Sequence, residues 1–139
     1  MNIKNGMTSA TLAVLFVLLA IGVPFGDNFL FAADGKSSLK DAEKTYLSYY
    51  EDSSNIGRAI DKLNRMSEQN SKDSQAMILL SRVWLTYGDV LARNRDEKLM
   101  ACENGRDIAK KAIEISPNDP DAHFWYTANM GRWGETRGV

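Results

Sequence analysis

Apolar side chains recur at intervals of three and four residues along most of the chain after residue 36. Such spacing places them on one face of an α-helix, and no alternating pattern typical of a β-strand persists beyond four residues. The clearest series consists of Ile56, Ala59, Ile60, Leu63 and Met66. Because no proline occurs between Lys36 and Ser116 and good helix formers dominate there, the pattern predicts an all-α fold.

Polar clusters that contain helix-capping residues divide this pattern into predicted helices. Asp73 or Ser74 is expected to cap the third helix. Gly88-Asp89 lies inside that helix's apolar pattern, as a turn or as a tolerated glycine, and a charged break follows at 93–97. The predicted helices cover residues 37–51, 56–67, 74–91, 96–116 and 120–130.

The break at 116–120, with the sequence SPNDP, carries the clearest capping chemistry in the chain. Pro117 has no backbone N–H and disfavours helix in the residue before it, so it closes the preceding helix. Asp119 is a typical N-cap, and Pro120 then occupies the first helical position, where a missing N–H costs nothing. A helix, a five-residue break and a second helix predict an αα-hairpin.

These helix pairs resemble tetratricopeptide repeats (TPR). Gly88-Asp89 falls on the hairpin turn of that motif, residues 112–117 match its closing signature, and 42–66 form a weaker copy. The last unit, from Asp119, has a shortened first helix. The first-helix positions of the motif fall on Met77, Leu80, Ser81 and Trp84, where the small Ser81 lets neighbouring helices approach closely. The resemblance implies tandem antiparallel hairpins stacked into an α-solenoid, because such hairpins cannot bury their apolar faces alone.

Residues 1–33 differ from the rest of the chain. Thr11 to Val23 is almost wholly apolar and uncharged, Lys4 precedes it, and the helix-breaking Pro24 follows. This order is typical of a secretory signal peptide. An uncleaved anchor is the alternative, although the run is shorter than the roughly 20 residues that span a bilayer. We therefore expect an exported domain over 34–139, periplasmic, or inner-membrane-anchored if the N-terminal helix is retained.

Two families share features of the segment 122–135, AHFWYTANMGRWGE. It is similar to the T component of tripartite ATP-independent periplasmic (TRAP) transporters, although those proteins are typically longer lipoproteins and no lipobox cysteine is present here. The regulator-of-microtubule-dynamics proteins have a similar A-H-x-W-Y segment. The bacterial-type signal peptide favours the transporter resemblance, which implies that this chain is C-terminally incomplete.

Charge and rare residues narrow the chemistry further. The chain has 17 Lys and Arg against 18 Asp and Glu, a net charge of −1, which implies neither a nucleic-acid-binding surface nor a polybasic membrane patch. Cys102 is the only cysteine, and we expect it to be a small buried apolar residue. His123 is the only histidine, and we expect it to lie at the surface or near the helix cap. No catalytic, metal-binding or cofactor-binding motif is present, so we expect a protein that is not an enzyme.

Aromatic residues are the candidate site residues. In stacked helix pairs the first helices line the concave face, where aromatic side chains can contact a peptide or an apolar ligand. Core packing between the helices is the alternative. The candidate groove residues are Tyr50, Tyr87, Tyr126, Trp84 and Trp125.

Together these features predict an exported protein–protein interaction module, an adaptor in the cell envelope that serves membrane transporter components. A periplasmic carrier of a small apolar ligand and a membrane-anchored structural subunit of an envelope complex are the alternatives. Trp125, Met130 and Trp133 lie close to the end of the sequence with little chain left to cover them. This predicts self-association through the C-terminal face, or a fragment of a longer repeat protein.

Overall fold

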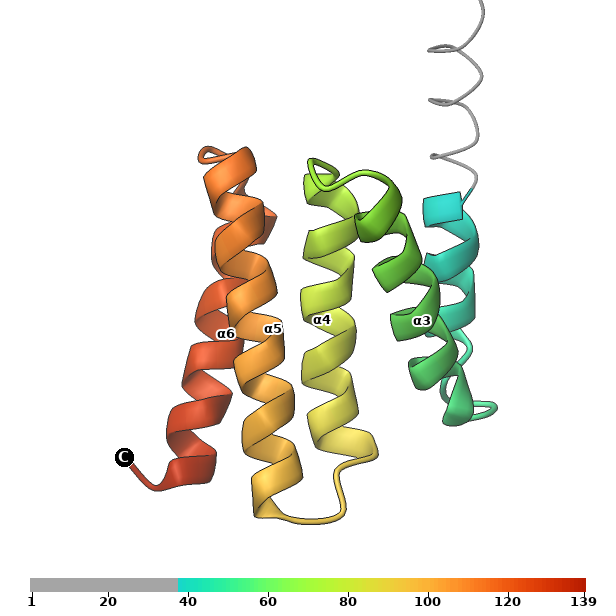
Figure 1. The fold of residues 1–139 in the computed structure, drawn as a ribbon. Helices are drawn as coiled ribbons and strands as arrows, with labels where there is room; N and C mark the ends of the chain where they lie inside the picture. The colour runs from blue at the N-terminus through green and yellow to red at the C-terminus, as the bar shows by residue number, and fades with distance from the viewer. Residues whose placement is uncertain (1–37) are drawn as a thin grey trace, which may run out of the picture. The chain divides into compact units, whose positions relative to one another are not determined.

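The computed structural model describes residues 38–139, and within this range all regular secondary structure is helical. The predicted signal peptide or anchor at 1–33 lies outside the described residues. The described part belongs to one compact unit, Asp34–Val139. None of its helices combines the length and the hydropathy that a membrane span requires. The helical residues are 38–47, α3 (Ser54–Gln69), α4 (Ser74–Val90), α5 (Arg95–Ile115) and α6 (Pro120–Arg137) (Figure 1).

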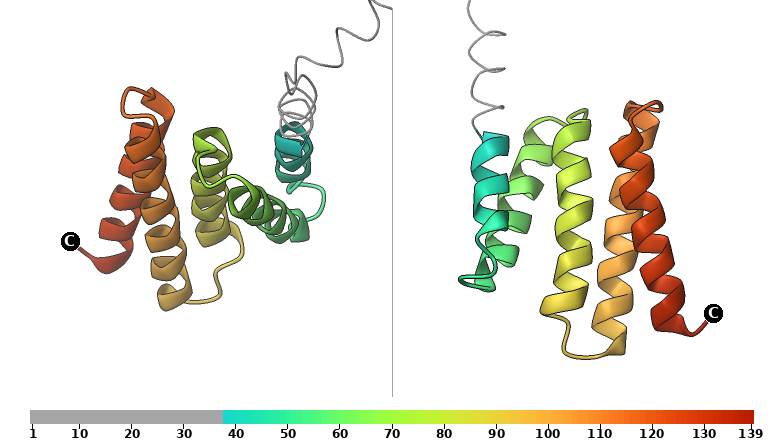
Figure 2. Two further views of the ribbon diagram at one scale, coloured as in Figure 1. Left: turned by 45° about the horizontal axis from the view of Figure 1, so that its top comes forward. Right: turned by 180° about the vertical axis from the view of Figure 1, so that it is seen from behind.

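Successive helices run in opposite directions and are joined by short turns (Figure 1). α4 contacts α3, α5 and α6, and α5 also packs along α6. Figure 2 shows from two further directions that α4 lies between α3 and α5. Because α3 and α5 have no contact with each other, the face of α4 between them is left open.

Side-chain caps fix where three of the helices begin. The carboxylates of Asp73 and Asp119 and the amide oxygen of Asn94 accept hydrogen bonds from backbone N–H groups in the next turn, at 2.9–3.0 Å. These bonds satisfy amides that have no partner inside the helix. The predicted capping role of Asp73 and the predicted start of α6 at Pro120 are confirmed.

The structure settles the two alternatives at Gly88 and corrects the predicted end of the last helix. Gly88 is helical rather than part of a turn, and a Cβ there would lie 3.2 Å from Cβ of Ala101, so glycine permits close approach of α4 and α5. α6 does not end near Met130 but continues to Arg137, after which Gly138 adopts φ 86° and donates to the carbonyl of Gly134. At 18 residues, α6 is not a shortened helix compared with the 17 residues of α4.

The core has two clusters of different character. The first joins 38–47, α3 and α4 through large side chains such as Ile56, Leu63 and Leu80. The second joins α4, α5 and α6 and is formed by Met77, Ile78, Ala112 and Ala122. Ala101, Cys102 and Ala109 of α5 are also fully buried. The small residues of α5 allow its backbone to approach its neighbours more closely than large side chains would.

A buried polar contact joins α4, α5 and α6. The side chain of Asn129 is fully buried, and its Nδ2 donates to the carbonyl of Trp125 at 2.9 Å and to Oγ and the carbonyl of Ser81 at 3.1 and 3.3 Å. Among residues 38–139 its Oδ1 has no hydrogen-bond partner, and it faces Gly105, where a Cβ would lie only 2.2 Å away. Ser81 is itself fully buried, so this contact lies inside the helix interface.

The contact between Gly105 and Asn129 predicts an unusual response to alanine. Gly105→Ala should lower the free energy of unfolding by about 1–3 kcal/mol through overpacking. Gly131→Ala should instead raise it by roughly 0.5–1 kcal/mol, because alanine favours a helix and no atom lies within 4 Å of that position. Urea unfolding of both variants checks this, and equal stabilisation by both would show that the close contact is absent.

Candidate functional site

A groove of about 190 Å³ lies where residues 38–47, α4 and α6 converge. These are the alternate helices of the chain, separated in sequence by α3 and α5. The apolar part of the lining comes from all three of them, and two carboxylates lie on the outer helices. The lining residues are Leu39, Glu43, Gln75, Ile78, Leu79, Arg82, Asp121 and Trp125.

Arg82 of α4 connects the two outer helices of this groove. Its Cζ lies 5.1 Å from the ring centroid of Tyr46 and 5.5 Å from that of Trp125. The Tyr46 ring is buried, and its hydroxyl shares a hydrogen bond of 2.9 Å with Oγ1 of Thr86 on α4. The guanidinium is therefore held between two aromatic rings that are themselves fixed, an arrangement favoured by cation–π attraction.

Among residues 38–139, no side chain or backbone group accepts a hydrogen bond from the Arg82 guanidinium. Within residues 38–139 its guanidinium forms no ion pair, although seven ion pairs connect other side chains there. Glu43 and Asp121 line the same groove and are exposed, yet neither carboxylate pairs with it. A guanidinium presents five donors in a planar fork that matches a carboxylate, so the groove contains an available acceptor-binding group.

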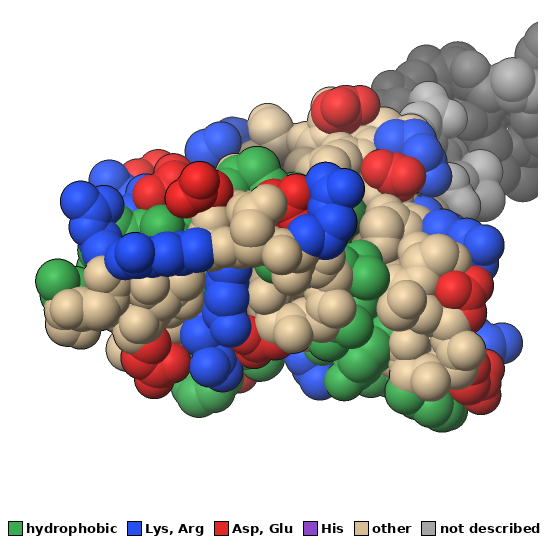
Figure 3. Space-filling model, turned by 90° about the horizontal axis from the view of Figure 1, so that it is seen from below, with side chains coloured by type: hydrophobic (Ala, Val, Ile, Leu, Met, Phe, Trp, Pro, Cys, Tyr) green, Lys and Arg blue, Asp and Glu red, His purple; other side chains and the backbone are tan. Residues whose placement is uncertain are grey.

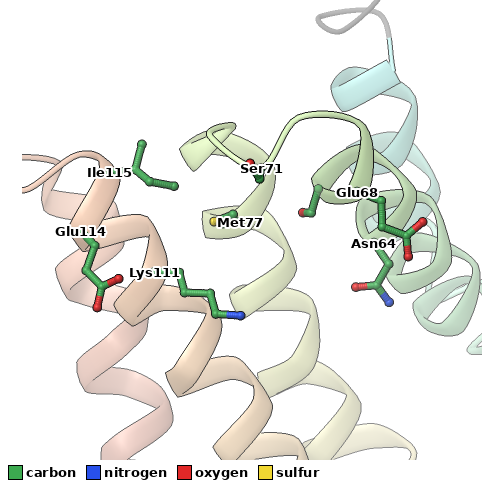
Figure 4. A pocket seen from close by; sticks show the side chains of 8 residues that line it. Asn64, Glu68, Ser71, Met77, Lys111, Glu114 and Ile115 are labelled. Atoms are coloured by element: carbon green, nitrogen blue, oxygen red, sulfur yellow. The ribbon is translucent and has the colours of Figure 1, made fainter.

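A second groove, of about 600 Å³, occupies the gap between α3 and α5 (Figure 4). Met77 of α4 and Ile115 of α5 supply its apolar lining, and Lys111 extends into it from α5. Glu68 and Glu114 lie on its two walls. The rim is thus of mixed charge, and the groove is open and faces away from the first one.

A third hollow lies at the end of the molecule shown in Figure 3, where basic and acidic side chains are interspersed. Asp89 pairs there with Lys98 at 3.0 Å and with Arg132 at 3.3 Å. Arg95 donates to the carbonyls of Thr136 and Arg137 at the end of α6. Because their N–H groups already have acceptors within the protein, these cations are poorer binding groups than Arg82.

The five aromatic residues singled out from the sequence lie in different environments. Trp125 alone among them lines the groove of Arg82. Trp84 and Tyr87 pack against each other, with ring centroids 5.3 Å apart, and against the first core cluster. Tyr50 is 76% exposed after the helix 38–47, and Tyr126 is half-buried on α6.

Sequence reasoning missed Arg82 and Tyr46 as site residues. A signal for Arg82 was present, since it is the one charged residue between Ala76 and Tyr87, the most apolar stretch outside the N-terminal segment. No local pattern reports that Tyr46 and Trp125 meet it from both sides, because these residues are far apart in the sequence.

The exposed face of α6 bears on the predicted self-association. Phe124 and Met130 are exposed, at 59% and 39%. Trp133 is instead held by the protein, since its Nε1 donates to Glu103 at 2.9 Å and Arg137 lies over its ring. Self-association through this face stays a prediction.

Neither Cys102 nor His123 forms part of a reactive cluster. Among the described residues, no group of three or more His, Cys, Asp or Glu side chains is arranged to hold a metal ion. The His123 ring is exposed, with Nε2 2.7 Å from the carbonyl oxygen of Pro117. Cys102 is fully buried, as expected, and burial raises the pKa of its thiol above the usual 9.0.

Cys102 therefore provides a probe of unfolding. At pH 8 in the folded protein, alkylation by iodoacetamide should be much slower than that of a free thiol, because the thiolate is disfavoured and inaccessible. The rate should rise through the urea unfolding transition. Mass spectrometry of the alkylated protein checks this, and rapid stoichiometric labelling without urea would contradict the packing around α5.

The fold and the groove together define the class of protein, an all-helical domain. Its candidate binding site lies on 38–47, α4 and α6. The family model described as Regulator of microtubule dynamics protein 1-3 matches residues 38–139, which are all the residues described above. The chain belongs to this family. No curated protein and no solved structure matches it. The match covers all the described helices. Segment 122–135 resembled two families, and the match favours the regulator family over the transporter component.

Proposed function

We propose that residues 34–139 are a non-enzymatic protein-interaction module whose hairpins stack in the manner of TPR repeats. In this proposal a partner segment lies in the groove formed by 38–47, α4 and α6. The observation that carries it is Arg82, a cation positioned over the rings of Tyr46 and Trp125 whose guanidinium N–H groups have no acceptor among the described residues. Groups held ready in this way at a surface groove are typical of recognition sites.

The helix contacts support the TPR-type arrangement. α4 and α6, which would be first helices of successive repeats, contact each other directly, whereas α3 and α5, the second helices, do not. Residues 38–47 join the same layer through the hydrogen bond of Tyr46 to Thr86. First helices would then form one layer that a partner can cross, which is the binding surface expected of such repeats.

The chemistry of the groove favours a protein segment over a small apolar ligand. Pockets that enclose small molecules typically measure about 300–1,000 Å³ and are mostly apolar. This groove measures about 190 Å³ and contains three charged side chains, Glu43, Arg82 and Asp121. An extended peptide can use a shallow groove of this kind because it also contacts the surface on either side.

Partner and location are separate proposals. An exported adaptor for transporter components, or an anchored subunit of an envelope complex, follows from the N-terminal segment. A role in microtubule dynamics is suggested by the name of the family. That name describes the proteins on which the family model is based. The two proposals place the module in different compartments. Whether residues 1–33 are removed from the mature protein therefore distinguishes between them.

N-terminal sequencing of the protein isolated from its native cell tests export. If residues 1–33 are a cleaved signal peptide, the mature chain should begin at Ala33 or Asp34, because signal peptidase removes the apolar segment. Recovery of Met1 in a membrane fraction would instead support the anchored subunit. Recovery of Met1 in the soluble cytoplasmic fraction would contradict both forms of the export proposal.

Position-dependent crosslinking tests the groove. Because Cys102 is buried, a surface cysteine introduced into the full-length protein can carry a photoreactive label. Labels at Glu43→Cys and Asp121→Cys, on opposite sides of the groove, should crosslink the same partner protein in cell extracts. A label at Glu114→Cys, on the wall of the groove over Met77, should not.

Glu114→Cys is a matched control, since it removes the same charge from another exposed position. A partner crosslinked only from position 114 would move the binding site to the gap between α3 and α5. Absence of crosslinks from all three positions would overturn the proposed interaction module.

A further inference from the structure

We propose that Arg82 binds a carboxylate of the partner, and that the groove therefore selects protein segments in which an acidic residue is flanked by basic ones. This inference rests on the proposed function and specifies the chemistry of the partner. It is carried by the placement of Arg82 between two rings and by the charges on either side of it.

Aromatic rings from two helices lie close to the Arg82 guanidinium. Tyr46 and Trp125 each lie within 5.5 Å of Cζ, at ring faces contributed by the two outer helices. An arginine that packs against aromatic rings can also form bidentate hydrogen bonds through its N–H groups. A carboxylate matches that edge, and a charge-assisted pair is stronger than one between neutral groups.

The carboxylates of the protein flank this site without filling it. Glu43 lies on the helix 38–47, Arg82 on α4 and Asp121 in the first turn of α6. Because α4 lies between the other two helices, a segment that crosses the groove meets negative, positive and negative charge in turn (Figure 1). The complementary segment carries Asp or Glu at its centre and Lys or Arg on both sides.

The same pattern disfavours other anions. A polyanion or an anionic lipid surface would bring negative charge close to Glu43 and Asp121 as well as to Arg82. Like charges in proximity disfavour such a complex. Leu39 and Leu79 supply apolar contact between the charged positions, which suits side chains of a peptide.

Selection from a displayed library of random 12-residue peptides on the full-length protein tests the inference. The selected peptides should share one acidic position with basic residues on both sides. In fluorescence polarisation, replacing that acidic residue by its amide should weaken binding to the wild-type protein about ten- to a hundredfold. The Arg82→Gln variant should bind the acidic and the amide peptide equally, because the partner of the carboxylate has been removed.

Three further variants separate recognition from folding. Arg82→Lys keeps the charge but loses the fork, so it should recover only part of the affinity. Lys111→Gln removes one positive charge from the groove between α3 and α5 and should leave binding within twofold. Glu43→Gln combined with Asp121→Asn should weaken the preference for basic flanking residues while the acidic position remains. Equal urea midpoints of the Arg82 variants and wild type would confirm that the fold is retained.

The outcomes distinguish this inference from the proposed function. Selected peptides that lack a shared acidic position, or an Arg82→Gln variant that still discriminates the acid from the amide, overturn the carboxylate site. In either case, crosslinks from positions 43 and 121 would leave the interaction module standing. If no peptide is selected and no crosslinks form, both proposals fail.

Discussion

The buried amide of Asn129 is the contact on which the arrangement of α4, α5 and α6 depends. Burying an amide is unfavourable unless its hydrogen bonds are replaced, and here Nδ2 finds acceptors on Ser81 and Trp125. The two bonds to Ser81 connect α6 to α4, and the bond to Trp125 lies within α6. The opposite side of the same amide lies against Gly105, so α5 is held at a distance that only glycine permits.

This contact also positions the candidate site. Arg82 is adjacent to Ser81 on α4, and Trp125 is one helical turn before Asn129 on α6. Fixing Ser81 against Asn129 therefore brings the Arg82 guanidinium to the face of the Trp125 ring. On the other side, the hydrogen bond between Tyr46 and Thr86 places a second ring against Arg82 from the helix 38–47. The groove is thus a consequence of two polar contacts between helices rather than of apolar packing alone.

How much of this could be predicted from the sequence depends on the range of each interaction. Caps such as Asp73 and Asp119 act within one turn, so the starts of α4 and α6 were predicted correctly. The end of α6 was not, because Gly131 and Gly134 are weak helix formers and the local sequence does not report the hydrogen bond from Trp133 to Glu103 of α5. Likewise, the aromatic candidates were chosen by residue type, whereas the environment of Arg82 depends on residues 36 and 43 positions away, which no local pattern reports.

The residues that hold α4 and α6 together are different from the charged residues on the two sides of the groove. This difference bears on the other members of the family. Glu43 and Asp121 are exposed and make no contact with the buried amide, so their charge can change without disturbing the packing of α4 on α6. Surface substitutions of this kind usually alter stability by less than about 0.5 kcal/mol. If the proposed function holds, proteins that retain the Asn129 contact and differ at the two flanking positions would keep the fold and select different partner segments.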